Sequence, residues 1–182
     1  MERQDYIVNQ TESSIGWTGK KMNGSCNGTI NISGGTLTVD NGNLIAGEFV
    51  VDTRSIRILD ITDPDTNDQF RGHLASEDFF ASEEFPTAKL EISNVSKPVN
   101  RNYHIIADLT IRGIKQPIAF DAEVAKVSEE TLKASGRLII DRTKYNMKFR
   151  SGRFFKDLGS ALIDDDFILD VQLTARHRDY NQ

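Results

Sequence analysis

Several residue types that define common protein classes are scarce in this sequence of 182 residues. The single cysteine, Cys26, excludes an intramolecular disulfide and a metal cluster held by cysteines. Apolar runs reach a few residues, far short of the roughly 20 that a membrane-spanning helix needs, so we predict no membrane span. Proline occurs only four times, which suits a chain rich in strands. These absences favour a globular chain with its own core, and its length suits one domain over residues 1–182.

Positively charged residues are fewer than negatively charged ones, and this limits the kinds of partner that the protein can bind. The net charge is −5 and the isoelectric point is about 5.2, so the overall field repels phosphate backbones and we predict no nucleic-acid partner. The three histidines, His73, His104 and His177, lie far apart in the sequence and do not have metal-ligand spacing. No serine elbow or phosphate-binding glycine loop is present. We therefore predict no cofactor, no metal and no catalytic residue.

Apolar and polar residues alternate along most of the chain, as in the stretch Ile105, Ala107, Leu109 and Ile111. The same pattern recurs over residues 15–17, 30–32, 37–39, 49–51, 90–92, 118–124, 132–140 and 167–173. One apolar face and one face exposed to solvent are typical of antiparallel strands. One short helix is predicted between Asp60 and Glu84. The sequence therefore predicts an all-β fold of about eight strands, in a barrel or a sandwich.

Asn41-Gly42 is the strongest hairpin signal, because both residues tolerate the positive φ of a two-residue turn. Such a turn pairs Val39 with Leu44 on one face. Phe49 then falls on the opposite face from Leu44, so we predict a β-bulge at Ala46-Gly47 that restores the register.

The stretch from Arg142 to Lys156 combines four further cations with four aromatic residues, Tyr145, Phe149, Phe154 and Phe155. Such a combination can stack bases and hold phosphates, or hold the diphosphate of a lipid. It can equally form a half-buried hairpin whose cations face water. The negative net charge makes the nucleic-acid interpretation the weakest of the three.

Four segments together resemble the YceI-like family. They are the segment RGHLASEDFFASEEFPTA at 71–88, LTIRGIKQPIAF at 109–120, IDRTKY at 140–145 and FVVDTRSI at 49–56. Their order and spacing also agree with that family. The resemblance implies an eight-stranded antiparallel lipocalin-like barrel with one short helix. It further implies non-enzymatic binding, storage or carriage of a long-chain isoprenoid lipid, either a prenyl diphosphate or an isoprenoid quinone.

The resemblance and the alternation together predict the residues that bind such a lipid. Arg142 and Lys144 are expected near the head group. The residues expected to line the cavity are Trp17, Phe49, Phe79, Phe80, Phe85, Leu90, Ile105, Leu109, Phe120, Leu138 and Phe167. Burial of the tail would contribute roughly 0.8 kcal/mol for each CH₂ group.

Two other functions stay open at this stage. A barrel filled by its own side chains would act as an interaction or stress-associated module, and an enzyme on this scaffold would need a buried acid or base with a shifted pKa. The sequence leaves the oligomeric state open between a monomer and a homodimer. Residues 1–8 lack the apolar segment of a secretory signal, so we expect a cytoplasmic location, or a periplasmic one if an export signal has been removed.

Overall fold

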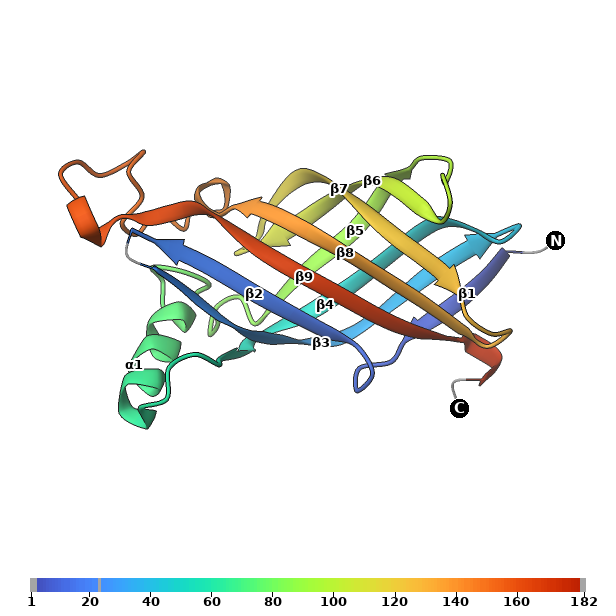
Figure 1. Cartoon of the computed structure of the whole chain (residues 1–182), viewed down its shortest axis with the longest axis horizontal. Coiled ribbons are helices and arrows are strands. Elements are labelled where there is room, and N and C mark those ends of the chain that lie inside the picture. Colours follow the sequence, from blue (N-terminus) through green and yellow to red (C-terminus); the bar gives the residue numbers. More distant parts are fainter. Residues whose placement is uncertain (1–2, 23, 181–182) are drawn as a thin grey trace.

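A computed structural model of the protein describes residues 3–22 and 24–180, and Figure 1 shows its strands wrapping around one interior. The strands among these residues are β1 (Arg3–Val8), β2 (Ser14–Lys21), β3 (Gly24–Asp40), β4 (Asn43–Ile58), β5 (Thr87–Val95), β6 (Asn102–Ile111), β7 (Ile114–Lys126), β8 (Thr131–Asp141) and β9 (Ile163–His177). One α-helix, α1 (Pro64–Ala75), and three short 3₁₀ helices, η1 (Arg142–Tyr145), η2 (Gly159–Ala161) and η3 (Arg178–Tyr180), complete the described elements.

The strands form a closed antiparallel barrel with eight positions. Strands β2 to β9 each pair with the next, and β9 pairs back with β2. β1 and β2 share one position, because β1 pairs with β3 through Arg3↔Asp40 whereas β2 pairs with the opposite half of β3 through Lys21↔Gly24. Asn9 separates them, its side-chain oxygen accepting from the backbone N–H groups of Thr11 and Glu12. The predicted eight-stranded antiparallel barrel with one helix is confirmed.

The hairpin between β3 and β4 has the predicted turn at Asn41-Gly42, with φ of 52° and 82°. Val39 pairs with Leu44 as expected. The register shift, however, falls between Leu44 and Ala46, so Ile45 is the extra residue and the bulge begins earlier than Ala46-Gly47. The parity argument called for one additional residue in this strand, and any position between the turn and Phe49 satisfies it.

Helix α1 begins where the sequence offers a cap. The Asp63 carboxylate accepts from the Thr66 backbone N–H at 2.9 Å, and Pro64 occupies the first turn, where its missing N–H costs no hydrogen bond. The Asn67 side chain donates to the carbonyl oxygens of Ile58 and Ile61, which fastens α1 beneath the end of β4. Among the described residues, no helix combines the length and apolar character needed to cross a membrane.

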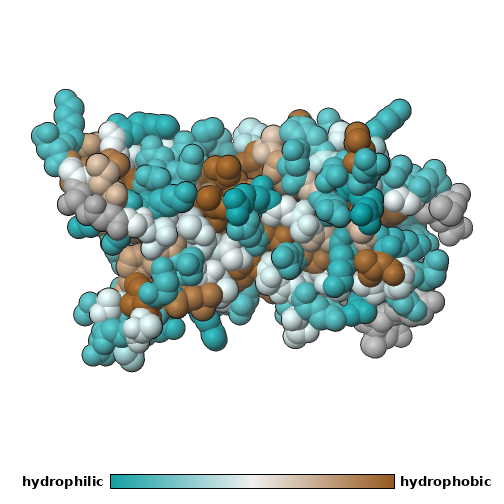
Figure 2. Space-filling model, in the orientation of Figure 1, coloured by the Kyte–Doolittle hydropathy of each residue, from teal (hydrophilic) through white to brown (hydrophobic). Residues whose placement is uncertain are grey.

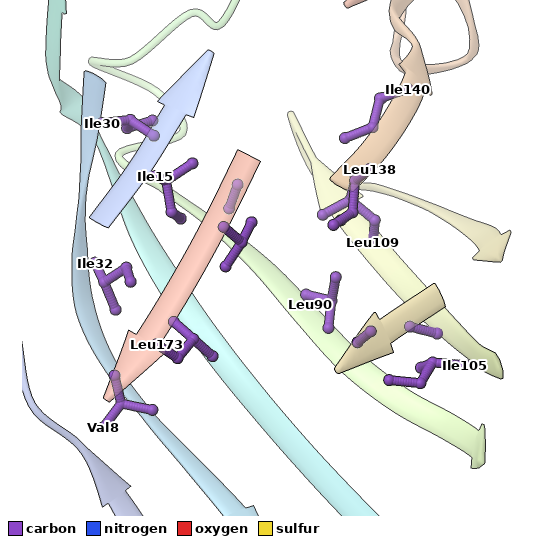
Figure 3. Close-up of a cluster of buried hydrophobic side chains, with 14 of the residues drawn as sticks. Val8, Ile15, Ile30, Ile32, Leu90, Ile105, Leu109, Leu138, Ile140 and Leu173 are labelled. Carbon is purple, nitrogen blue, oxygen red and sulfur yellow. The ribbon is translucent and has the colours of Figure 1, made fainter. Parts of the chain in front are cut away.

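The inward face of the barrel is apolar, and Figure 3 shows branched aliphatic side chains from several strands pointing into it. The end of the barrel near the N-terminus is closely packed and contains a cavity of only about 50 Å³. Tyr6 and Ala175 have no exposed surface there, and the hydroxyl of buried Tyr103 accepts from the Leu44 backbone N–H at 3.1 Å. On the face of the molecule that Figure 2 shows, hydrophilic residues predominate, with apolar patches between them. The opposite end, where α1 lies, is hollow.

Candidate ligand-binding cavity

A cavity of about 430 Å³ occupies the half of the barrel next to α1. That volume lies within the range of small-molecule binding sites, roughly 300–1,000 Å³. Its wall is mainly aliphatic and aromatic. The apolar side chains that line it are Ile15, Trp17, Ile30, Phe49, Val51, Ile56, Ile61, Phe70, Leu74, Phe79, Phe80, Ala88, Leu90, Leu109, Ile111, Leu138, Met147, Ile163, Phe167 and Leu169.

The cavity reaches the surface at one end of the barrel, here called the mouth, where exposed charged residues line it. Lys20 and Lys21 end β2, Asp60 follows β4, and Asp164 and Asp166 begin β9. Half-buried Lys89 also lines the cavity and is already paired with Glu48 at 3.3 Å. Positive and negative groups are therefore balanced around the mouth, while the wall behind them is apolar.

Nine of the thirteen predicted ligand-binding residues line this cavity: Trp17, Phe49, Phe79, Phe80, Leu90, Leu109, Leu138, Arg142 and Phe167. The other four, which the structure also describes, lie outside its wall. Ile105 and Phe120 point into the barrel as their parity predicts, but they pair with each other deeper along β6 and β7 and line a separate cavity of about 50 Å³. Alternation identifies the face of a strand on which a residue lies. The height of that residue along the barrel axis depends on the tilt and stagger of the strands.

Phe85 and Lys144 lie outside the wall of the large cavity for local reasons. Phe85 lies between α1 and β5, where its half-buried ring rests against Gly113 in the β6–β7 turn and its carbonyl oxygen accepts from the Thr53 hydroxyl at 2.7 Å. Lys144 lies in η1, and this 3₁₀ turn directs Arg142 inward and Lys144 outward into solvent.

Further lining residues were absent from the prediction, although the sequence carries a signal for most of them. Ile15, Ile30 and Val51 have the inward parity of the strands already identified. Phe70 and Leu74 are four residues apart on α1, which places both on one helix face. Nothing in the sequence indicates that α1 closes the barrel end with this face.

Phe49, Leu90 and Leu138 line both the large and the small cavity, so these three side chains form the partition between them. Leu90 is only 2% exposed, and it pairs with Phe49 across β4–β5 and with Leu109 across β5–β6. The partition ends the large cavity and limits how far an apolar chain can enter the barrel.

Arg142 combines a place in the cavity wall with a role in holding the chain. It is 3% exposed, and its guanidinium donates to the carbonyl oxygens of Met147, Ile163 and Asp164 at 2.6, 3.1 and 2.9 Å. Three of its five N–H groups are thus used by described residues. Burial lowers the pKa of this guanidinium, and the carboxylates of Asp165, Asp141 and Asp164 oppose that shift.

Segments from all four of the sequence motifs meet at the mouth. Arg112 donates from the β6–β7 turn to the carbonyl oxygens of Glu77 and Phe79 at 2.6 and 2.7 Å. The Ser82 hydroxyl donates to the carbonyl oxygen of buried Thr53 at 3.0 Å. Arg142 lies 5.8 Å from the centre of the Phe79 ring. The motifs therefore build the scaffold that holds the end of the barrel open.

Cys26 also lines the cavity, beside Asp60 at the mouth. Its thiol donates to the Asp60 carboxylate at 3.3 Å. Burial, with the hydrogen bond to that carboxylate as the next cause, raises the pKa of the Cys26 thiol to about 12. The side chain is therefore a neutral thiol at physiological pH, and it contributes a weakly polar group rather than a nucleophile.

Comparison with known protein families shows which family has this architecture. The model of the YceI-like domain matches residues 6–175, which include nearly all of the barrel. The chain belongs to the YceI-like family. The UPF0312 protein plu2095 of Photorhabdus laumondii is 27% identical over 153 residues, covering 80% of this chain and 71% of that protein. Protein YceI of Escherichia coli is 27% identical over 146 residues, covering 80% of this chain and 72% of that one.

Solved structures of low sequence identity share the YceI-like fold. BcnA of Burkholderia cenocepacia superimposes with a TM-score of 0.74 at 22% identity, covering 92% of this chain and 99% of BcnA. A polyisoprenoid-binding domain from Saccharophagus degradans superimposes with a TM-score of 0.68 at 14% identity, covering 94% of this chain and 98% of that domain. These two likenesses show that the chain has the fold of these structures. The second structure is described by the ligand class that it binds.

Proposed function

We propose that this YceI-like protein binds an isoprenoid lipid, with the apolar tail in the large cavity and the head group at the mouth, and that it stores or carries the lipid without transforming it. The observation that carries this proposal is the cavity of about 430 Å³, whose wall is apolar and whose charged side chains gather at the mouth. The interior is not filled by its own side chains, so the structure offers room that a packed interaction module would lack. The polyisoprenoid-binding domain of the same fold supports the choice of ligand.

The charges around the mouth favour a head group with little net charge. Lys20 and Lys21 are offset by Asp60, Asp164 and Asp166, and three N–H groups of Arg142 are taken by carbonyl oxygens. A diphosphate bound among the residues that line the mouth would meet three carboxylates, and the two lysines of that lining are already offset by them. Of the two predicted head groups, the mouth therefore supports an isoprenoid quinone better than a prenyl diphosphate.

Binding without catalysis is supported by the two titratable side chains of the cavity lining whose pKa is shifted. Cys26 is held as a neutral thiol, and Arg142 is a hydrogen-bonded cation. Neither is poised to exchange a proton near neutral pH, as a general acid or base would be. The cellular compartment and the oligomeric state stay predictions from the sequence.

The single tryptophan of the sequence, Trp17, reports on the cavity directly. Titration with a prenylated benzoquinone should quench its fluorescence, while benzoquinone without a tail should quench far less at equal concentration. A prenyl diphosphate with the same tail should compete weakly. Lipid extraction and native mass spectrometry of the purified protein should identify a bound isoprenoid.

Two alanines provide a matched pair of variants. Ala88 is buried in the cavity wall, whereas Ala119 is exposed on β7. A88F should fill the space of two or three CH₂ groups and weaken binding roughly 15-fold to 60-fold, while A119F should bind like the parent. Equal affinity of both variants, or no saturable quenching in the parent, would refute the proposal.

A further inference from the structure

The segment at 148–162 contains most of the basic and aromatic stretch noted in the sequence. Lining the cavity does not account for that composition. Met147 and Ile163, which flank this segment, both line the cavity, so the segment is attached to the mouth at its two ends. The Ile163 backbone N–H donates to the Arg150 carbonyl oxygen at 3.0 Å, which closes the loop at its base. Figure 1 shows it projecting from the same end of the barrel as α1, on the other side of that end.

This loop exposes large apolar side chains. Phe154 and Phe155 are 47% and 49% exposed. Met22, in the β2–β3 turn, is 63% exposed, and its backbone N–H donates to the carbonyl oxygen of Leu162 at 3.3 Å. The β2–β3 turn and the loop are thus joined, and residues 20–22 and 148–162 together are here called the basic platform.

Cations surround these apolar side chains. Lys148 lies 4.6 Å from the centre of the Phe154 ring, and Arg150 lies 5.0 Å from that of Phe149. Arg153 is held by Asp141 and Asp165. The other cations of the platform are Lys20, Lys21, Lys148, Arg150 and Lys156. These five side chains are exposed and form no ion pair with a described residue. The platform contains one carboxylate, that of Asp157.

The remainder of the molecule has the opposite charge. The chain as a whole carries −5 despite the six cations of the platform. Across the mouth, the first half of α1 and its cap contain Asp63, Asp65 and Asp68. A negatively charged surface would therefore attract the platform side of the mouth and repel the α1 side, so the molecule would meet that surface with the platform.

From this arrangement we infer that the basic platform docks the mouth of the barrel on an anionic lipid bilayer. Lysine and arginine side chains meet the head groups, and Phe154, Phe155 and Met22 enter the interfacial region. A tail could then pass between bilayer and cavity without crossing water. Docking stands on the platform alone, whereas its role in lipid transfer rests on the proposed function.

Vesicle flotation tests the inference on the full chain. The protein should float with vesicles of phosphatidylglycerol and phosphatidylcholine, float far less with phosphatidylcholine alone, and be released by high salt. K148Q/K156Q should weaken binding about 25-fold, since each interfacial cation accounts for about fivefold. F154S/F155S should weaken it by a similar factor, because each half-exposed ring still has about half its surface to bury.

Matched controls lie in the β5–β6 turn at the opposite end of the barrel, where Val99 is 70% exposed. K97Q/R101Q and V99S should bind vesicles like the parent, and circular dichroism should show all variants folded. Trp17 quenching by a prenylated benzoquinone delivered from ethanol should persist in the platform variants. Loss of quenching in the parent with flotation retained would refute lipid binding and leave docking supported.

Three results would overturn docking. The parent chain might fail to float with anionic vesicles while Trp17 quenching persists, or the platform variants might float as well as the controls. Tighter binding of a fluorescent single-stranded oligonucleotide than of the vesicles, lost in the same variants, would assign the platform to nucleic acid.

Discussion

Arg142 holds the mouth together through its bonds to three carbonyl oxygens, and replacing it tests that role. The R142M variant keeps an unbranched apolar stem but leaves the carbonyl groups of Met147, Ile163 and Asp164 without this donor. A buried acceptor that loses its partner costs about 1–3 kcal/mol. Since water can reach some of these groups at the mouth, we expect a loss of about 4 kcal/mol rather than the full sum.

Unfolding in urea and by heat measures this loss. For a chain of this size, each 1 kcal/mol shifts Tm by roughly 2–4 °C, so R142M should melt roughly 8–16 °C below the parent. Arg137 is the matched control, because it lies on β8, the strand that leads into η1, and among the described residues its guanidinium bonds to surface Asp170, at 2.8 and 3.3 Å. R137M should cost no more than about 1 kcal/mol.

The opposite outcome is equally informative. If R142M unfolds within about 1 kcal/mol of the parent, the three carbonyl bonds do not hold the mouth. If the variant instead keeps its stability and loses affinity for a prenyl diphosphate alone, Arg142 acts as a head-group ligand. That result would also contradict the preference for a head group of little charge.

Three further predictions concern the cavity wall. L90A should cost about 3 kcal/mol in urea unfolding and join the two cavities, so that longer prenyl tails gain affinity; an unchanged tail preference would argue against the partition. G28A should be strongly destabilised in thermal melts, because a Cβ there overlaps the Arg57 carbonyl oxygen and lies 2.6 Å from the Trp17 ring, whereas G19A, with open space around it, should melt normally. Cys26 should react with iodoacetamide roughly a thousandfold more slowly than a free thiol at pH 8. Since burial raises the pKa of its thiol from 9.0 to about 12, its contribution to stability should be complete below pH 9.0 and fade as pH rises toward 12, a loss absent in C26S.

Local signals in the sequence predicted most of the fold. Alternation along β6 and β7 indicated which residues face inward, and Asn41-Gly42 specified its hairpin because few residues adopt positive φ at both turn positions. One short helix was predicted between Asp60 and Glu84, and α1 lies within that range. The bulge was predicted from parity but misplaced, because parity counts residues without saying where the extra one lies.

The site was less predictable, because several of its features depend on contacts between distant segments. Ile105 has the inward parity of Leu109, yet they line different cavities because they lie at different heights along β6. The donors of Arg112 reach carbonyl oxygens more than thirty residues away along the chain. No spacing rule predicts such bonds.

The sequence by itself determined that the chain would form antiparallel strands with one apolar face, because side-chain alternation is a local property of each strand; it left a barrel and a sandwich open. The tertiary structure alone decided that one half of the interior is packed and the other hollow. Whether inward side chains meet across a barrel depends on strand tilt, on stagger and on the elements at its ends. At the mouth, side chains of α1, Arg142 and Met147 form part of the wall beside the strands, and the aromatic residues there line a cavity instead of filling it.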